Sequence, residues 1–151
     1  MDILNRFSSW FKLKHAVALG TKYVNILQIR VSQKRAGQEP NVRGKSLSMS
    51  VLVEDLQQAE HRIIKNVQQH YFHEEVTVLQ NLKDGQFKNY AETKTRNQKL
   101  KHISSLHRLD PFVDQHGIVR VGGRIKHADV TFQQKHPVVL PKNSYITTLV
   151  I

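Results

Sequence analysis

The chain has 151 residues, of which 39% are hydrophobic and 7% aromatic, so it suits one modest domain but is poor in residues for a single compact core. Its 23 lysines and arginines outnumber 12 aspartates and glutamates, and the resulting formal charge of +11 favours polyanionic partners such as nucleic acid. The lack of cysteine excludes disulfides, thiolate nucleophiles and cysteine-ligated zinc.

The first predicted element is a helix from Trp10 to about Val31, with Ser8 or Ser9 as its N-cap. Apolar residues recur along it at spacings of three and four, which is typical of one buried helical face. Gly20 in its middle costs about 1 kcal/mol relative to alanine, so we expect a weak point there without a break. An apolar face with no upstream partner predicts either self-association or docking on the second helix.

Residues 32–50 are predicted to form a flexible basic linker. Between Arg30 and Lys45 there are five cations, one carboxylate and hardly any apolar residues. Such a segment buries too little surface to offset its ordering entropy. It is either a solvated spacer between two modules or a tether that contacts phosphates without sequence preference.

The second helix is predicted from Val53 to about Phe72, where apolar residues follow one stripe and acidic residues gather near the N-terminal end. His70 and His73 form an HxxH pair close to its other end. The more specific interpretation of this pair is a metal site on one helical turn, but no third and fourth ligands follow at suitable spacing. Solvated or helix-terminal histidines explain the pair better, so no metal or other cofactor is predicted.

A short apolar run from Val76 to Leu82 precedes a second basic segment. Periodicity alone does not decide whether this run is a strand or a helix. Between Lys83 and Arg108 there are seven cations and two carboxylates, with Phe87 and Tyr90 nearby to stack on bases. The alternative is a solvated surface, which is the usual role of a charge run. The candidate nucleic-acid contacts in this segment are Lys94, Arg96, Lys99 and Lys101.

The segment from Ser105 to Ile151 begins with a predicted β-hairpin. Two short apolar runs, Pro111–Val113 and Ile118–Val121, surround Asp114–Gly117, whose acidic first residue and final glycine suit a tight reversal with glycine at positive φ. Gly122 and Gly123 then end or bulge the second strand, because a residue without Cβ permits a close backbone approach.

A third apolar run, Val138–Leu140, lies between Pro137 and Pro141. Each proline lacks an N–H group and so limits a strand ladder at its end. A last helix is predicted to begin at Tyr145, with Asn143 or Ser144 as its cap.

Basic residues of the second hairpin strand alternate with apolar ones, which in a strand places them on the face opposite Val119 and Val121. Such a face could follow a phosphate backbone. The alternative is that these residues lie on the solvent-exposed face of a small antiparallel sheet, which is the commoner arrangement. The additional candidate nucleic-acid contacts are Arg120, Arg124 and Lys126.

The sequence argues against an enzyme. A two-metal polynucleotidyl transferase needs three converging carboxylates. Asp110 and Asp114 have complete explanations as turn residues, and neighbours such as Glu74 and Glu75 point in different directions. There is no GxSxG motif and no phosphate-cradling glycine loop. No catalytic residue is therefore predicted.

Three stretches, in this order, resemble the polyproteins of BEL/Pao-type retrotransposons. They are RFSSWFKLKHAVA at residues 6–18, VEDLQQAEHRIIKNVQQHYFHEE at residues 53–75, and the series LDPFVDQHGIVRVGGRI, KHPVVLP and SYITTLVI from residue 109 onward. The resemblance covers well over half of the chain. It implies a connector after reverse transcriptase and RNase H, leading into the integrase zinc-binding module.

The resemblance also implies that the integrase catalytic core and the zinc ligands, a histidine pair and a CxxC pair, lie beyond Ile151. It carries no ligand role onto His136. The family usually has threonine or serine at the position of Leu52, where either is a better N-cap. The absence of such a cap destabilises the helix by about 0.5–2 kcal/mol unless Ser50 caps it instead.

Together these features predict an α+β fold in which N-terminal amphipathic helices are joined by basic linkers to a small antiparallel hairpin and a truncated C-terminal helix. The expected segments are an N-terminal helix at 1–31, the linker at 32–50, an amphipathic helix with a basic segment at 51–104, and the hairpin and strand platform at 105–151.

The expected function is that of a non-catalytic, integrase-proximal segment of a polyprotein, with weak electrostatic binding of nucleic acid that does not depend on base sequence. The alternative is a module that binds itself or another part of the polyprotein through its apolar helix faces. No run approaches the roughly 20 apolar residues of a membrane helix, so no membrane partner is expected. The sequence assigns no compartment.

Overall fold

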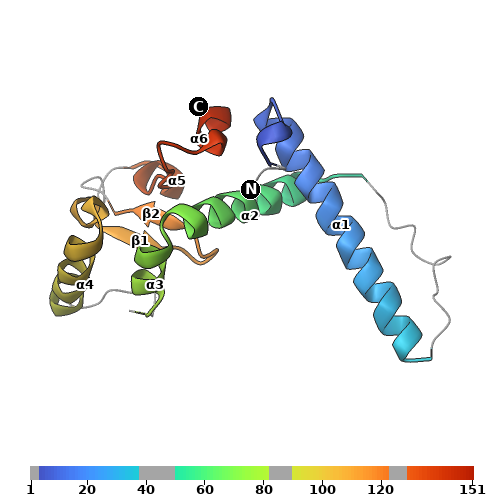
Figure 1. Ribbon diagram of the computed structural model, residues 1–151, viewed down its shortest axis with the longest axis horizontal. Helices are drawn as coiled ribbons and strands as arrows, with labels where there is room; N and C mark the ends of the chain where they lie inside the picture. Colours follow the sequence, from blue (N-terminus) through green and yellow to red (C-terminus); the bar gives the residue numbers. More distant parts are fainter. Residues whose placement is uncertain (1–3, 38–49, 82–89, 123–128) are drawn as a thin grey trace. The chain divides into compact units, whose positions relative to one another are not determined.

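The computed structural model describes residues 4–37, 50–81, 90–122 and 129–151 and has an α+β architecture, as predicted (Figure 1). Helices make up most of it, and two strands form a small antiparallel sheet. The elements in chain order are η1 (Leu4–Arg6), α1 (Trp10–Arg35), α2 (Val53–Tyr71), α3 (His73–Asn81), α4 (Tyr90–Ile103), η2 (Ser105–Leu109), β1 (Pro111–Val113), β2 (Val119–Val121), α5 (Phe132–Lys135) and α6 (Tyr145–Val150).

The chain divides into two compact units. The first unit consists of Met1–Arg62 with Leu149–Ile151, and the second unit consists of Ile63–Thr148. The boundary falls inside α2, so this helix gives its first half to one unit and its second half to the other.

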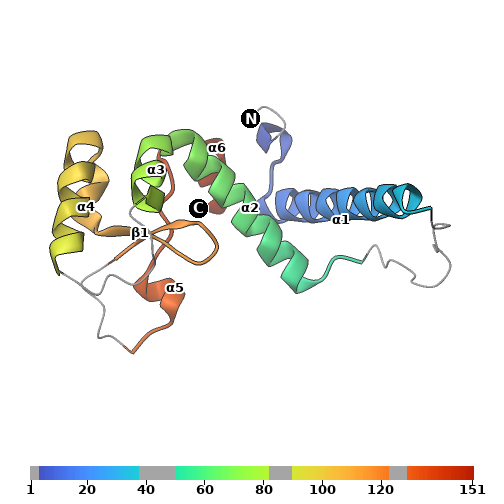
Figure 2. The same ribbon diagram turned by 90° about the horizontal axis from the view of Figure 1, so that it is seen from below.

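In the first unit α1 is one long helix without a break at Gly20 (Figure 2). Ser9 is its N-cap, as predicted, although the serine side chain makes no capping hydrogen bond. The helix passes the expected end at Val31 and runs to Arg35, so the start of the predicted linker is helical. It closes at Gly37, whose φ of 68° is the left-handed conformation typical of a helix end. The remainder of that linker, residues 38–49, lies outside the described residues.

Ion pairs connect α1 to the first half of α2, whereas most of the apolar residues predicted to form a docking face on α1, such as Phe11, Leu27 and Val31, are exposed. Lys14 Nζ lies 2.9 Å from Glu60 Oε2, and Lys22 Nζ lies 2.6 Å from Asp55 Oδ2. The buried apolar residues of this unit are Leu13, Ala18 and Ala59. Two ion pairs therefore join the two helices.

The start of α2 at Val53 agrees with the prediction, although Leu52 at the cap position has no capping side chain. The N–H of Leu52 donates to Asp55 Oδ2 at 2.8 Å. This contact is one half of a capping box, in which the third helical residue reaches back to the cap. Asp55 thus supplies part of the capping that Leu52 lacks.

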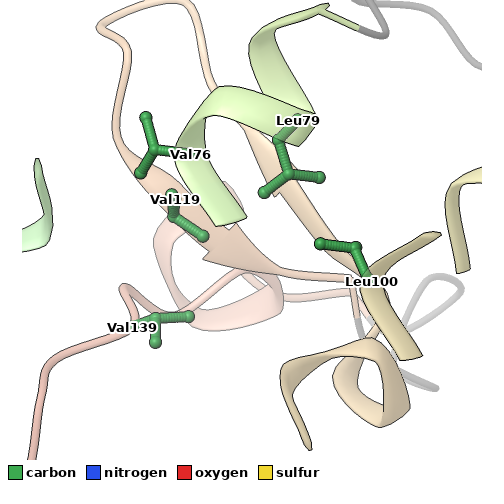
Figure 3. Close-up of a cluster of buried hydrophobic side chains, with 5 residues drawn as sticks. All are labelled: Val76, Leu79, Leu100, Val119 and Val139. Carbon is green, nitrogen blue, oxygen red and sulfur yellow. The ribbon is translucent and has the colours of Figure 1, made fainter. Parts of the chain in front are cut away.

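The core of the second unit is a cluster of five buried side chains from four parts of the chain (Figure 3). Val76 and Leu79 come from α3, so the undecided run at 76–82 is helical as far as Asn81. The cluster is completed by Leu100 of α4, Val119 of β2 and Val139. Every member is an aliphatic residue that loses its solvent contact, and burial of each stabilises the fold by about 1.5–3 kcal/mol at most.

The hairpin forms as predicted, with Pro111 opposite Val121 and Val113 opposite Val119. At its turn Asp114 Oδ1 accepts the N–H groups of His116 and Ile118, each at 2.9 Å. Gly117 closes the turn with φ of 78°, as its position in the tetrad predicts.

Gly122 follows β2 where two backbone segments approach closely. A Cβ atom at Gly122 would lie 2.6 Å from the carbonyl oxygen of Asp110. The predicted need for glycine here is confirmed, whereas Gly123 lies outside the described residues.

Gln68 of α2 links β2 to the third apolar run. Its side-chain Nε2 donates to the carbonyl oxygens of Val119 at 2.9 Å and Val139 at 2.7 Å, and its Oε1 accepts the N–H of Val119 at 2.7 Å. Gln68 itself is 1% exposed. The run at 138–140 makes a single bridge with Arg120 instead of a full ladder, and the Gln68 amide adds a hydrogen bond to the Val139 carbonyl oxygen.

Two short helices complete the second unit. Thr131 and Gln134 form a capping box that starts α5, a helix that the sequence reasoning missed. Ser144 Oγ accepts the N–H of Ile146 at 3.3 Å, which confirms Ser144 as the cap of α6.

Candidate functional site

Lysines on the outer side of α4 form the main candidate site. Leu100 anchors α4 from the inside and is fully buried. Lys94, Lys99 and Lys101 are exposed. Because successive helical residues are about 100° apart, these lysines lie roughly 100–120° around the helix from Leu100. They therefore do not point into the core: Lys94 and Lys101 lie on one flank of the helix and Lys99 on the other, and we call the three the α4 lysines.

The α4 lysines make no ion pair with any residue that the structure describes. Their charges can therefore attract an anionic partner. At physiological salt this attraction is screened beyond about 8 Å. Arg96, the fourth candidate of this segment, also belongs to α4, but its side chain is not among those described.

Two further basic groups are exposed near the C-terminal end of α4. His102 is exposed near the end of α4, and Arg108 is exposed in η2, the element that packs most closely on α4. Arg108 belongs to the same basic stretch of sequence as the α4 lysines. The continuous charge run was the signal that could have included it.

Arg120 was predicted on a solvated basic sheet face, and that prediction is wrong. Its side chain is 8% exposed, and Nε lies 2.6 Å from Asp114 Oδ2, whose own side chain is 4% exposed. Nη1 donates to the carbonyl oxygen of His136 at 2.9 Å, and the guanidinium carbon lies 5.5 Å from the Phe132 ring centroid. Arg120 is therefore withdrawn as a nucleic-acid contact.

The Arg120–Asp114 pair is held in one geometry by further hydrogen bonds. Burial alone would raise the pKa of Asp114. The hydrogen bond from Arg120 and those from the N–H groups of Ile118 and His116 outweigh burial, and the pKa of Asp114 is lowered. The carboxylate therefore stays ionised and joins the hairpin turn to β2, which is a structural role.

The face of β2 opposite Val119 is covered because α5 and the residue after it lie over it. The ring of His136 contacts Phe112 edge-on at 5.0 Å between centroids and Phe132 at 4.9 Å. Its Nδ1 is 3.1 Å from the carbonyl oxygen of Val121 and donates to it. Arg124 and Lys126, the other two candidates of this strand, lie outside the described residues.

No metal centre forms within residues 4–37, 50–81, 90–122 and 129–151, where no three His, Asp or Glu side chains meet. His70 and His73 are exposed, and the helix is interrupted at Phe72 between them. The HxxH pair therefore does not lie on one continuous helical turn, which removes the geometry of the metal interpretation.

The C-terminal half of α1 presents a second surface. Val24, Leu27 and Val31 are 49%, 40% and 50% exposed, and they follow one another at spacings of three and four. Arg30, Lys34 and Arg35 are exposed on the same half. This half of α1 therefore combines apolar and cationic groups.

Comparison with family models, with curated proteins and with solved structures found no match to this chain. Among the helices that the structure describes, none combines the length and the apolar character needed to cross a membrane. The chemistry of the two surfaces is therefore the basis for a functional proposal.

Proposed function

We propose that this chain is a non-catalytic connector of a BEL/Pao-type retrotransposon polyprotein, located before the integrase, and that it binds nucleic acid electrostatically through the α4 lysines. The three resembling stretches and their order support the first part. The nucleotide sequence on either side tests it, because a reading frame that continues into a histidine pair and a CxxC pair is expected. A frame that closes at once would contradict a connector within a longer product.

The exposed position of the α4 lysines carries the binding proposal. They share one helix with a buried anchor, so their backbone positions are fixed relative to one another. Lysine ammonium groups contact phosphate oxygens as point charges and do not read base edges. Binding is therefore expected to be weak and nearly independent of base sequence.

The salt dependence of the affinity is a quantitative test of this proposal. Three phosphate contacts predict a fall in affinity of roughly 20- to 40-fold between 50 and 200 mM salt, for single and double strands respectively. Fluorescence anisotropy with labelled oligonucleotides of two unrelated sequences measures this slope, and the two sequences should bind within about twofold of each other.

A charge-reversal triple variant, Lys94→Glu with Lys99→Glu and Lys101→Glu, locates the site. It should abolish detectable binding at 50 mM salt, because attraction becomes repulsion at all three positions. The matched control reverses three exposed cations of the first unit, Arg30, Lys34 and Arg35, and should retain binding. Equal loss in both variants would indicate that total charge matters and that α4 is not the site.

A second candidate function is a protein-interaction module, and the exposure of the apolar groups on the C-terminal half of α1 favours it. A stripe of aliphatic side chains half open to water is a common mark of an interaction surface. Substitution Leu27→Asp should weaken any such contact while leaving nucleic-acid binding intact. A pull-down or anisotropy assay with a partner helix tests it independently of α4.

A further inference from the structure

The C-terminal half of α1 carries an apolar stripe formed by Val24, Leu27 and Val31, which is the spacing through which one helix receives another. Together with Gln28 and Arg35 these side chains line an open hollow of about 650 Å³. The stripe therefore has the periodicity of a helix-docking surface.

Cations border this stripe, and α1 contains no carboxylate from Trp10 to Arg35. By helical position Arg30 and Lys34 lie on one side of Val31 and Arg35 lies on the other. None of the three forms an ion pair with a described residue. The surface is apolar in the middle and positive along both edges.

The N-terminal half of the same helix shows what kind of element such a surface accepts. There α1 receives the first half of α2, an amphipathic helix whose Asp55 and Glu60 pair with Lys22 and Lys14. The same combination of apolar centre and cationic edges recurs in the C-terminal half, where the described residues provide no second helix.

We propose that the C-terminal half of α1 docks an acidic amphipathic helix of a partner protein, with apolar residues on the stripe and carboxylates against Arg30, Lys34 and Arg35. This inference rests on the second candidate function, the interaction module, and adds the charge and secondary structure of the partner.

Charge excludes the simplest alternatives as the favoured occupant. A second copy of α1 would bring like charges together, because the helix has no carboxylate to offer. The neighbouring segment 38–49 contains Arg43 and Lys45 against Glu39, so its sequence does not supply an acidic helix either. Nucleic acid would match the cations but leave the aliphatic stripe without a complementary surface.

The test uses the full chain and a labelled helical peptide of about three heptads, with leucines at stripe spacing and glutamates beside them. Fluorescence anisotropy should show binding, and replacing the glutamates by glutamine should weaken it about tenfold, since three exposed helical ion pairs are lost. The variant with Arg30→Glu, Lys34→Glu and Arg35→Glu should reject the acidic peptide and bind a lysine-flanked version instead.

Controls separate the possible failures. The α4 lysine triple variant should bind the acidic peptide like the natural chain, and circular dichroism confirms that each variant keeps its helices. Equal binding of the glutamate and glutamine peptides, sensitive to Leu27→Asp, would overturn the acidic partner and keep the interaction module. Failure of every peptide to bind would overturn both.

Two parallel measurements use the same protein. Sedimentation across a wide concentration range should show a monomer, and a dimer lost on Leu27→Asp would replace the acidic helix by a second copy. Vesicles of phosphatidylserine and phosphatidylcholine should bind more weakly than the acidic peptide. Tighter vesicle binding through the same residues would overturn the proposal in favour of a lipid surface.

Discussion

Two cationic regions of the molecule differ in how the fold surrounds them: the C-terminal half of α1 and the start of β2. In the first unit Arg30, Lys34 and Arg35 project from α1 into solvent, whereas in the second unit Arg120 lies inside, against Asp114. The inner arginine has a carboxylate, a carbonyl acceptor and an aromatic ring around it, so its loss of hydration is compensated. A cation is available for binding only where the fold provides no such compensation.

The largest expected effect is on the inner pair. Substitution Asp114→Ala should lower the free energy of unfolding of the second unit by about 3 kcal/mol, because Arg120 is left buried without its counter-charge. Hydrogen exchange at the amides of Val119 and Val139 measures this, since both lie in the affected core. Trp10 fluorescence reports on the first unit and should change little. A shift below about 0.5 kcal/mol would mean that Arg120 finds water or another partner.

The next effect concerns the polar link in the same unit. Substitution Gln68→Ala should cost about 2–3 kcal/mol, because it removes three hydrogen bonds and leaves buried backbone groups of Val119 and Val139 unsatisfied. Gln69→Ala at the exposed neighbouring position is the matched control and should stay within about 0.5 kcal/mol. Urea denaturation followed by circular dichroism measures both. Equal effects would show that the link contributes nothing specific.

A smaller effect compares two glycines with the same backbone. Gly117 and Gly37 have φ of 78° and 68°, so alanine at either site costs about 1–2 kcal/mol locally. Gly117→Ala should lower the stability of the second unit by that amount, since the turn is part of the hairpin. Gly37→Ala should only fray the end of α1, without changing global unfolding. Helix content and thermal melting distinguish the two outcomes.

The last effect on stability is that of protonating Asp114, and it appears only in acid. Hydrogen bonds lower the pKa of Asp114 in the folded state. Its ionised form therefore stabilises the fold at pH values above the unfolded-state pKa of about 3.9. This stabilisation is lost as the pH falls through the folded-state pKa. Unfolding followed from pH 6 downward should show the loss, and Asp114→Asn should flatten it.

Asp55 provides the comparison in the first unit. Its pKa is also lowered, first by the hydrogen bond from Lys22 and then by that from the Leu52 N–H. The pair lies near the surface, so Asp55→Asn should change the acid slope less than Asp114→Asn does. A larger change of the acid slope for Asp55→Asn than for Asp114→Asn would show that the Lys22–Asp55 pair stabilises the fold more than the Arg120–Asp114 pair.

Local patterns predicted most elements. The stripe of α2, the tetrad that ends at Gly117 and the cap at Ser144 each rest on residues close in sequence, so their structure could be anticipated. The helix over residues 76–81 could not, because a short apolar run fits both periods.

Arg120 shows why the candidate site was only partly predictable. Strand alternation correctly separated Arg120 from Val119, but it does not say what covers each face. The cover is α5 with His136, and the Thr131–Gln134 capping pattern that announces α5 was present in the sequence. The lysines of α4 are exposed because Leu100 orients the helix, a contact between distant segments that periodicity does not reveal.

The Gln68 link also has a consequence for how the chain is made. Its two carbonyl acceptors lie 51 and 71 positions further along. During synthesis the second half of α2 therefore leaves the ribosome long before Val139 exists, and its amide must remain hydrated until then. Closing so long a loop is entropically costly and slow compared with forming a local helix. A nascent chain that stops before Val139 would leave the second unit, including the second half of α2, open to proteases and chaperones.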